Sequence, residues 1–158
     1  PTIQAPIDRL VNDFVYWAER LEQMNLAAPL GKKSGGQKLM PELLESRWAE
    51  YSKELLLANI QGLRALYTCS LEDKKGNALF HNQVDRGFEQ LANQILSQLQ
   101  QIERELQSWS FSMRQGLAQR PEKIEALYQL LKSLKQRLAT ELTSALGTVL
   151  NFTDNDGD

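Results

Sequence analysis

The stretch from Ala78 to Gln115 constrains the fold most, because its apolar residues recur with helical spacing along its whole length. Their steps of three or four residues place them on one face of a helix with a period of 3.6. They are Val84, Phe88, Leu91, Ile95, Leu99, Ile102, Leu106, Trp109 and Met113. A helix with a single apolar stripe is not stable alone in water, so other segments must cover this one.

Three further helices are predicted, and each begins at a proline, which is favoured at the first helical position. The first runs from Pro6 to about Asn25, the second from Pro41 to Lys75, and the last starts at Pro121. The alternative for the second is a break near Ser70, where residues 70–73 resemble a capping box. The first has the apolar face Ile7, Leu10, Val11, Phe14, Trp17, Ala18, Leu21 and Met24. The last has the apolar face Ile124, Leu127, Leu131, Leu134, Leu138, Leu142, Ala145 and Val149.

Short connections between these helices favour antiparallel packing of neighbours. We therefore expect an all-α fold, an elongated antiparallel four-helix bundle in which helices two, three and four are long and the first is shorter. Residues 1–150 would form one domain, and residues 151–158 would form an acidic, flexible tail. Three serines between Ser108 and Ser112 weaken helices by bonding to nearby backbone, which leaves the continuity of the third helix open.

The second helix carries two apolar stripes in its C-terminal half. One stripe comprises Leu44, Trp48, Tyr51, Leu55, Ala58, Gly62, Ala65 and Cys69, and the other comprises Leu56, Ile60, Leu63 and Tyr67. The last four members of the first stripe are small. They would either let another helix pack closely or form the floor of a groove for a ligand or a partner helix. Cys69 is expected to be a buried, small apolar residue.

Two aromatic side chains, Tyr16 and Phe111, lie away from the predicted core faces. Each is a candidate for contact with a partner. The alternative for Tyr16 is an isolated surface aromatic residue, which is common in globular proteins. For Phe111 the alternative is burial at a helix end, where Leu117 would fold back onto it after Gly116.

Residues 26–40 are predicted to form a mobile loop in which Lys32, Lys33 and Lys38 lie among glycines. Gly31 and Gly36 have the spacing of a phosphate-binding loop, but Gln37 stands where the lysine must be. Nucleotide binding is therefore not expected. The lysines remain candidates for a weak electrostatic contact.

Catalytic and cofactor-binding motifs are missing, so no enzyme, metal or cofactor is predicted. His81 is the single histidine, and we expect it to pair with Asp85 on a helix surface. It cannot form a zinc site with other histidines or a cysteine cluster. No Gly-x-Ser-x-Gly sequence accompanies it, and no dinucleotide-binding fingerprint is present.

Charge and cysteine content limit the class of partner. The net charge is −2, and much of it comes from the C-terminal aspartates, so the body gives no long-range attraction for nucleic acid or anionic lipid. No apolar run approaches the roughly 20 residues that span a membrane. A single cysteine, Cys69, excludes an internal disulfide and favours a reducing, cytoplasmic location.

These observations favour a non-enzymatic protein–protein interaction module, such as an adaptor, assembly factor or regulatory subunit. A homodimer is plausible, because the first helix is too short to cover the third. One alternative is a small helical subunit of a nucleoprotein complex that uses Lys32, Lys33 and Lys38 with Lys74 and Lys75. Another is a bundle that binds an apolar ligand over the small residues of the second helix.

Overall fold

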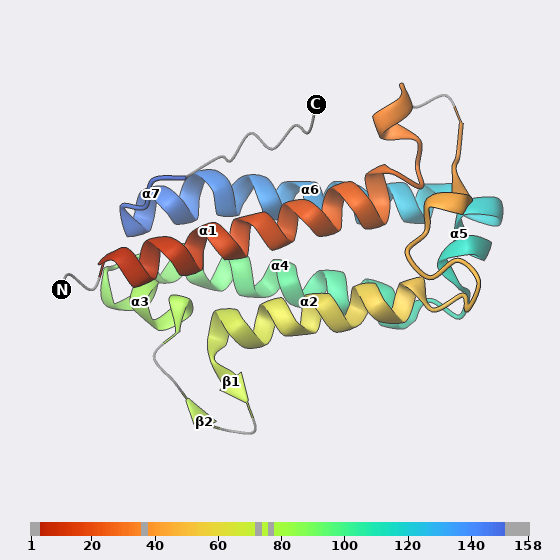
Figure 1. Ribbon diagram of the computed structural model, residues 1–158. Helices are drawn as coiled ribbons and strands as arrows, with labels where there is room; N and C mark the ends of the chain where they lie inside the picture. Colours follow the sequence, from red (N-terminus) through yellow and green to blue (C-terminus); the bar gives the residue numbers. More distant parts are fainter. Residues whose placement is uncertain (1–3, 36–37, 72–73, 76–77, 151–158) are drawn as a thin grey trace.

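The computed structural model describes residues 4–35, 38–71, 74–75 and 78–150 (Figure 1). The all-α prediction is confirmed. The strands in these ranges are two residues each, β1 (Ser70–Leu71) and β2 (Lys74–Lys75), paired antiparallel with Ser70 opposite Lys75. The predicted acidic tail, residues 151–158, lies outside the described residues.

Seven α-helices are described, several of them joined by short turns or continued by helices of another type. They are α1 (Gln4–Arg20), α2 (Ser52–Thr68), α3 (Leu79–Asp85), α4 (Glu89–Ser108), α5 (Met113–Gln119), α6 (Pro121–Arg137) and α7 (Thr143–Leu146). Two π-helical segments, Leu21–Ala27 and Leu138–Leu142, continue α1 and α6. Two 3₁₀ turns lie at Lys32–Ser34 and Pro41–Leu43.

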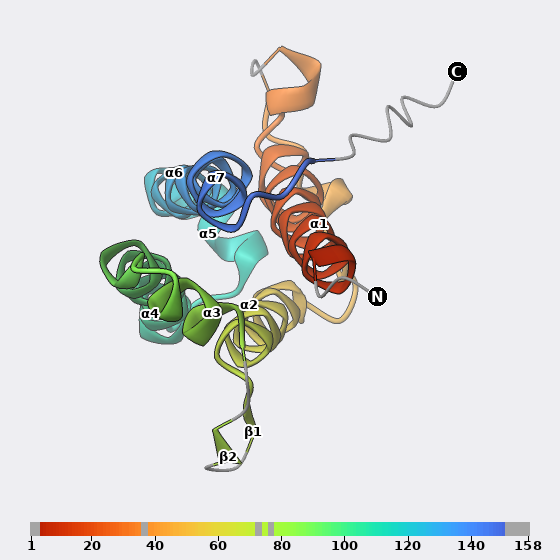
Figure 2. The ribbon, with the colours of Figure 1, turned by 90° about the vertical axis from the view of Figure 1, so that its left-hand side faces the viewer.

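Four long rods lie side by side around a common core (Figure 2). The rods are α1 and α6 with their π-helical continuations, together with α2 and α4. Each rod runs antiparallel to the two rods beside it (Figure 1). The core consists mainly of leucine and isoleucine, because these positions recur every three or four residues on each rod. Within α4, Ile95, Leu99, Ile102 and Leu106 are fully buried.

The predicted third helix is not continuous, and the structure divides it into α3, α4 and α5. Gly87 breaks it first, with φ of 85°, a left-handed conformation that glycine adopts without strain. The second break follows Ser108, and Ser112 then starts α5 as its N-cap. The Ser112 hydroxyl accepts from the Gln115 amide, and the Gln115 side chain accepts from the Ser112 amide, so the serine starts a helix instead of bending one.

The second helix is shorter than predicted. Of its two predicted apolar stripes, the one that begins at Leu56 faces the core. The helix begins at Ser52 instead of Pro41, so it is this rod, and not the first, that is short. Leu56, Ile60, Leu63 and Tyr67 enter the core. Trp48 and Tyr51, which the prediction placed on an apolar face, are exposed because they precede the helix.

The segment predicted as a mobile loop is partly core. Leu26, Ala27, Ala28 and Leu30 are buried, because the π-helical continuation of α1 carries them against α6. A π-helix closes wider turns than an α-helix, which changes the direction of every later side chain. Met24, predicted to be inward, is consequently exposed.

Polar contacts that are partly or fully buried tie neighbouring elements together. The Arg64 guanidinium on α2 lies 2.6 Å from the Glu103 carboxylate on α4. The Tyr67 hydroxyl, also on α2, donates to Gln83 on α3 and lies 3.3 Å from the Ala92 carbonyl oxygen on α4. Such buried side chains need partners, since an unpaired polar group in a core costs free energy.

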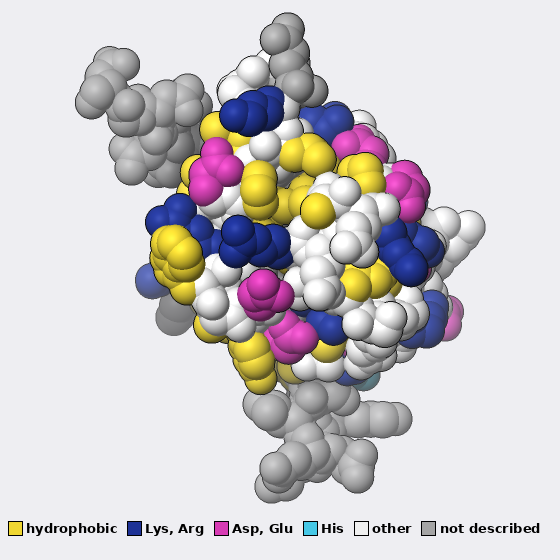
Figure 3. Space-filling view, turned by 90° about the vertical axis from the view of Figure 1, so that its right-hand side faces the viewer, with side chains coloured by type: hydrophobic (Ala, Val, Ile, Leu, Met, Phe, Trp, Pro, Cys, Tyr) yellow, Lys and Arg dark blue, Asp and Glu magenta, His cyan; other side chains and the backbone are white. Residues whose placement is uncertain are grey.

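The segment 38–51 crosses one end of the molecule, close to α5 (Figure 1). Hydrophobic side chains gather near the centre of this end and are flanked by basic and acidic ones (Figure 3). The segment exposes four large apolar side chains: Leu39, Leu43, Trp48 and Tyr51. Trp48 is the most exposed of these, at 83%, with the Arg47 guanidinium 4.7 Å from its ring centre.

Candidate interaction site

A groove of about 220 Å³ lies between the first two rods. Trp17 and Leu21 form one wall and Leu63 and Leu66 the other, and the floor residues are small. The full lining is Trp17, Leu21, Ala58, Asn59, Gly62, Leu63 and Leu66. Its apolar walls could take a side chain or a narrow helix from a partner, because apolar surface removed from water favours association.

The groove exists because α2 presents small residues on its outer face. Ala58 and Gly62 lie one turn apart and are both exposed. A Cβ atom added at Gly62 would have no neighbour within 4 Å among the described residues, so none of them requires a glycine there. Glycine in a helix interior costs about 1 kcal/mol relative to alanine. Close approach by another molecule would explain its presence.

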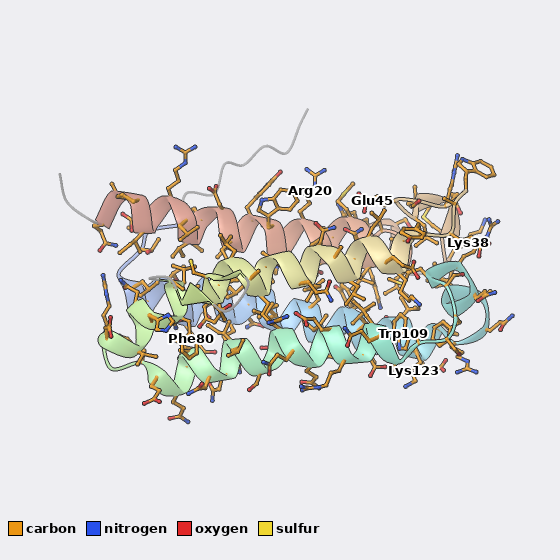
Figure 4. The ribbon with its side chains drawn as sticks, turned by 90° about the horizontal axis from the view of Figure 1, so that it is seen from below. Arg20, Lys38, Glu45, Phe80, Trp109 and Lys123 are labelled. Atoms are coloured by element: carbon orange, nitrogen blue, oxygen red, sulfur yellow. The ribbon has the colours of Figure 1, made fainter. Side chains whose placement is uncertain are left out.

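Exposed aromatic and apolar side chains border the groove. Trp17 is 44% exposed, and its ring lies edge-on to Tyr16, with centroids 6.4 Å apart. The Arg20 guanidinium lies 5.7 Å from the centre of the Trp17 ring. Arg20 is on the outer side of α1 (Figure 4). Leu66 on α2 is 40% exposed, so both walls leave apolar surface open to solvent.

Two members of the predicted row of small residues do not line the groove. Ala65 and Cys69 are half-buried, and Cys69 ends α2 in the left-handed conformation with φ of 47°. The first two members, Ala58 and Gly62, face solvent. Sequence reasoning missed the opposite wall, because it placed Trp17 in the core. Val15 was the available signal, because this buried apolar residue lies outside the predicted stripe and turns the inward face of α1 away from Trp17.

Phe111 is half-buried between two neighbours instead of standing free. Its ring stacks on that of Trp109, with centroids 5.0 Å apart and planes inclined by 17°. The Arg120 guanidinium lies 5.1 Å from the centre of the Phe111 ring. Gly116 belongs to α5 and does not end it, and its missing side chain leaves room for Phe111. Trp109, at the end of α4, lies near Lys123 of α6 (Figure 4), and both side chains donate to the Glu105 carboxylate.

The three candidate lysines have different surroundings in the structure. The Lys32 ammonium is 2.9 Å from the Glu125 carboxylate and 5.6 Å from the Tyr128 ring centre. Lys33 lies 3.7 Å from the Met24 sulfur, and Lys38 is exposed. Burial alone would raise the pKa of Glu125, but hydrogen bonds from Lys32 and Gln129 and the charges of Lys32 and Lys132 lower it.

A buried carboxylate, Glu22, lies close to Lys135 and Tyr128. It is 1% exposed, accepts a hydrogen bond of 2.7 Å from Gln23 and lies 3.8 Å from the Lys135 ammonium. Burial raises the pKa of Tyr128, and the nearby Glu22 carboxylate adds to that rise. Because each charge has a partner, we interpret these residues as tying the π-helical segment to α6.

The family model described as imelysin, a peptidase family by name, matches residues 2–141. The chain belongs to the imelysin family. No curated protein and no solved structure matches it.

The family name raises the question of a metal centre in this imelysin-family chain. In residues 4–35, 38–71, 74–75 and 78–150, no group of three or more His, Cys, Asp and Glu side chains is placed to hold a metal ion. The predicted pair of His81 and Asp85 is wrong in this structure. The His81 Nδ1 atom is buried and has no hydrogen-bond partner among the described residues, and the His81 ring lies edge-on to that of Phe80, with centroids 5.5 Å apart. Phe80 is labelled in Figure 4.

The lysines of the nucleoprotein alternative lie on opposite sides of the imelysin-family fold. Lys32 and Lys33 are near the end of the first rod, whereas Lys74 and Lys75 form β2, on the far side of the bundle (Figures 1 and 2). They therefore form no common basic patch. Among the described helices, none is long and apolar enough to cross a membrane.

Proposed function

We propose that this imelysin-family chain is a non-enzymatic interaction protein that binds a partner protein in the groove between α1 and α2. The observation that carries the proposal is the open space over Gly62 beside the exposed ring of Trp17. Tryptophan is enriched among the residues that dominate binding energy at protein interfaces. A partner side chain over Gly62 would gain contact with Trp17, Leu63 and Leu66.

The size of the groove favours a protein partner over a free apolar ligand. Sites for drug-sized molecules usually have volumes of about 300–1,000 Å³ and enclose most of the ligand. The groove is smaller, at about 220 Å³, and lies open along the surface. A side chain or helix from another protein brings further contacts around the rim, where Tyr16 and Met24 are exposed.

The test begins with native mass spectrometry of the protein purified from its own source, which identifies a bound polypeptide. Calorimetry then compares the affinity of that polypeptide for the variants Trp17→Ala and Gly62→Leu. We expect each to weaken binding at least about tenfold, equivalent to about 1.4 kcal/mol, with little change in thermal unfolding. Trp48→Ala is the matched control. Equal loss in all three variants, or loss in Trp48→Ala alone, would refute the groove as the site.

A second copy of the chain is one candidate partner, and sedimentation velocity tests it separately. A dimer that uses this groove should dissociate when Trp17 is replaced by alanine. A dimer that persists in the Trp17→Ala variant uses another surface. A monomer at all concentrations leaves a different protein as the partner.

The non-enzymatic part of the proposal has its own test, because the family name includes the word peptidase. Purified protein is incubated with an unfolded casein substrate, with and without added zinc or iron. We expect no new cleavage products by mass spectrometry. Cleavage that increases with protein concentration would overturn this part of the proposal. A cytoplasmic location remains a prediction and is checked by fractionating the source cells.

A further inference from the structure

A second hollow, larger than the groove between α1 and α2, lies along α4 where it packs beside α6 (Figure 2). Its volume is about 580 Å³. All but one of its lining residues come from α4, and all are polar: Gln90, Asn93, Gln94, Ser97, Gln98, Gln101 and Arg137. We call this hollow the amide groove. It shares no residue with the groove between α1 and α2.

The amide groove has an unusual wall for a solvent-exposed helix face. Residues 90–102 contain no charged side chain, although charged residues make up 24% of the chain. Exposed faces of helices in soluble proteins normally carry charged residues. Here the face offers primary amides and a serine hydroxyl, which are uncharged groups that donate and accept hydrogen bonds.

Most of these groups have no hydrogen-bond partner in the part of the chain that the structure describes. Gln90, Asn93, Gln94, Ser97 and Gln101 are exposed, and their side chains make no hydrogen bond to another described residue. Gln98 is different. It is buried, its Nε2 donates to the Leu130 carbonyl oxygen at 3.1 Å, and its Oε1 accepts from Arg137 Nη1 at 2.7 Å.

Gln98 thereby fixes the one charged group of the groove. The Arg137 Nε atom lies 3.2 Å from the Glu141 carboxylate, so the local charges cancel. The remaining nitrogen of the guanidinium, Nη2, has no hydrogen-bond partner in the described part of the chain. The groove is therefore neutral overall and keeps one oriented donor free.

We propose that the amide groove binds an extended, uncharged peptide segment through its backbone. A primary amide offers one acceptor and paired donors, so it can form two hydrogen bonds to a peptide group. Side chains four residues apart on a helix are separated by about 6 Å along its axis. In an extended peptide, the backbone groups that face one side recur about every 6.6–6.8 Å, so the two spacings nearly match. The polar side chains from Gln90 to Gln101 cover a length of helix that could contact roughly five residues of an extended peptide.

Other classes of ligand fit the amide groove less well. Phosphates and nucleic acids need lysine or arginine that is not already paired, and single-stranded bases need aromatic rings on which to stack. The lining includes no lysine and no aromatic ring. A neighbouring hollow of about 350 Å³ shares Gln90 and Gln94 with it and adds Gly87, Phe88, Leu91 and Glu141, whose charge is paired with Arg137. This end could accept one apolar side chain, which gives the peptide a direction.

The test measures binding of five-residue peptides by fluorescence polarisation. Each peptide carries an uncharged dye, has a blocked C-terminus and no charged residues, and has one leucine at each position in turn. The variant Gln94→Glu/Gln101→Glu should bind at least about tenfold more weakly, because carboxylates only accept hydrogen bonds. Gln107→Glu, an exposed position on α4 outside the groove, is the matched control. Trp17→Ala should bind these peptides normally, which separates this proposal from the proposed function.

Two further measurements identify the mode of recognition. Methylating the backbone nitrogens of the best peptide should abolish binding, and raising the salt from about 50 to about 500 mM should leave the affinity unchanged. Absence of peptide binding, tolerance of backbone methylation, or an equal effect of Gln107→Glu would overturn the proposal. Binding of a neutral oligosaccharide such as maltopentaose in place of peptides would overturn it as well. So would a dimer that dissociates in the Gln94→Glu/Gln101→Glu variant, because the groove would then bind a second copy of the chain.

Discussion

Gly62 and Gly116 both lie within helices, but their surroundings are opposite. A Cβ atom at Gly62 would meet nothing within 4 Å, whereas at Gly116 it would lie 2.7 Å from Ile124 Cδ1 and 2.9 Å from Phe111 Cε2. Gly62→Ala should therefore stabilise the fold by up to about 1 kcal/mol through helix propensity. Gly116→Ala should destabilise it by about 1 kcal/mol or more through crowding. Urea unfolding of both variants checks this, and equal shifts would contradict it.

Tyr67 is the buried residue whose ionisation should most affect stability. Burial raises the pKa of its hydroxyl above the ordinary value of 10.0. The folded state thus favours the neutral hydroxyl, so this contribution is complete below pH 10.0 and declines at higher pH, where the unfolded chain ionises. In Tyr67→Phe the decline in unfolding free energy above that pH should be smaller. An unchanged alkaline profile in titrated urea unfolding would count against this account.

The same hydroxyl also satisfies a buried partner. Removing it leaves the Gln83 Oε1 atom without its donor in a fully buried position, which should cost about 1–3 kcal/mol. The double variant Tyr67→Phe/Gln83→Leu should recover part of that loss, because both polar groups are then absent. A double-mutant cycle in urea measures the coupling. Purely additive losses would show that the pair makes no net contribution.

Among the elements, α5 depends for its stability on the residue that caps its N-terminus. Ser112 caps it through the reciprocal contacts with Gln115. Ser112→Ala should cost about 1 kcal/mol of stability. Ser110→Ala, an exposed change two residues earlier, should cost little. Thermal unfolding of the two variants decides the matter, and a larger effect at Ser110 would be contrary to the assigned cap.

The elements also show what could be predicted from sequence and what could not. The stripe from Ile95 to Met113 and the stripe from Ile124 to Leu142 are buried as the helical period predicts. The period could not locate Gly87 as a break, because the apolar stripe continues across it. It also could not choose between the two stripes of the second helix, since both have helical spacing. The groove wall at Trp17 and the neutral hollow on α4 depend on how rods pack, which periodicity does not specify.

In the whole molecule, α4 lies between α2 and α6 and packs on both. Its buried stripe and the side-chain links through Gln98 and Glu103 should make it the most stable part. Hydrogen exchange followed by mass spectrometry should therefore show the slowest exchange in residues 95–106. Exposed amides in residues 38–51 should exchange quickly, as that segment forms only one short 3₁₀ turn. Similar rates in both segments would contradict this arrangement.

The three tryptophans occupy three distinct environments: Trp109 is 4% exposed, Trp17 is 44% exposed and Trp48 is 83% exposed. Indole emission shifts to longer wavelength as the ring meets water, so each residue reports a different event. A chain that keeps only Trp109 would signal loss of the core. One that keeps only Trp17 would signal occupation of the groove between α1 and α2, and Trp48 would supply an optical reference. The fold thus carries its own set of fluorescent sensors without any added dye.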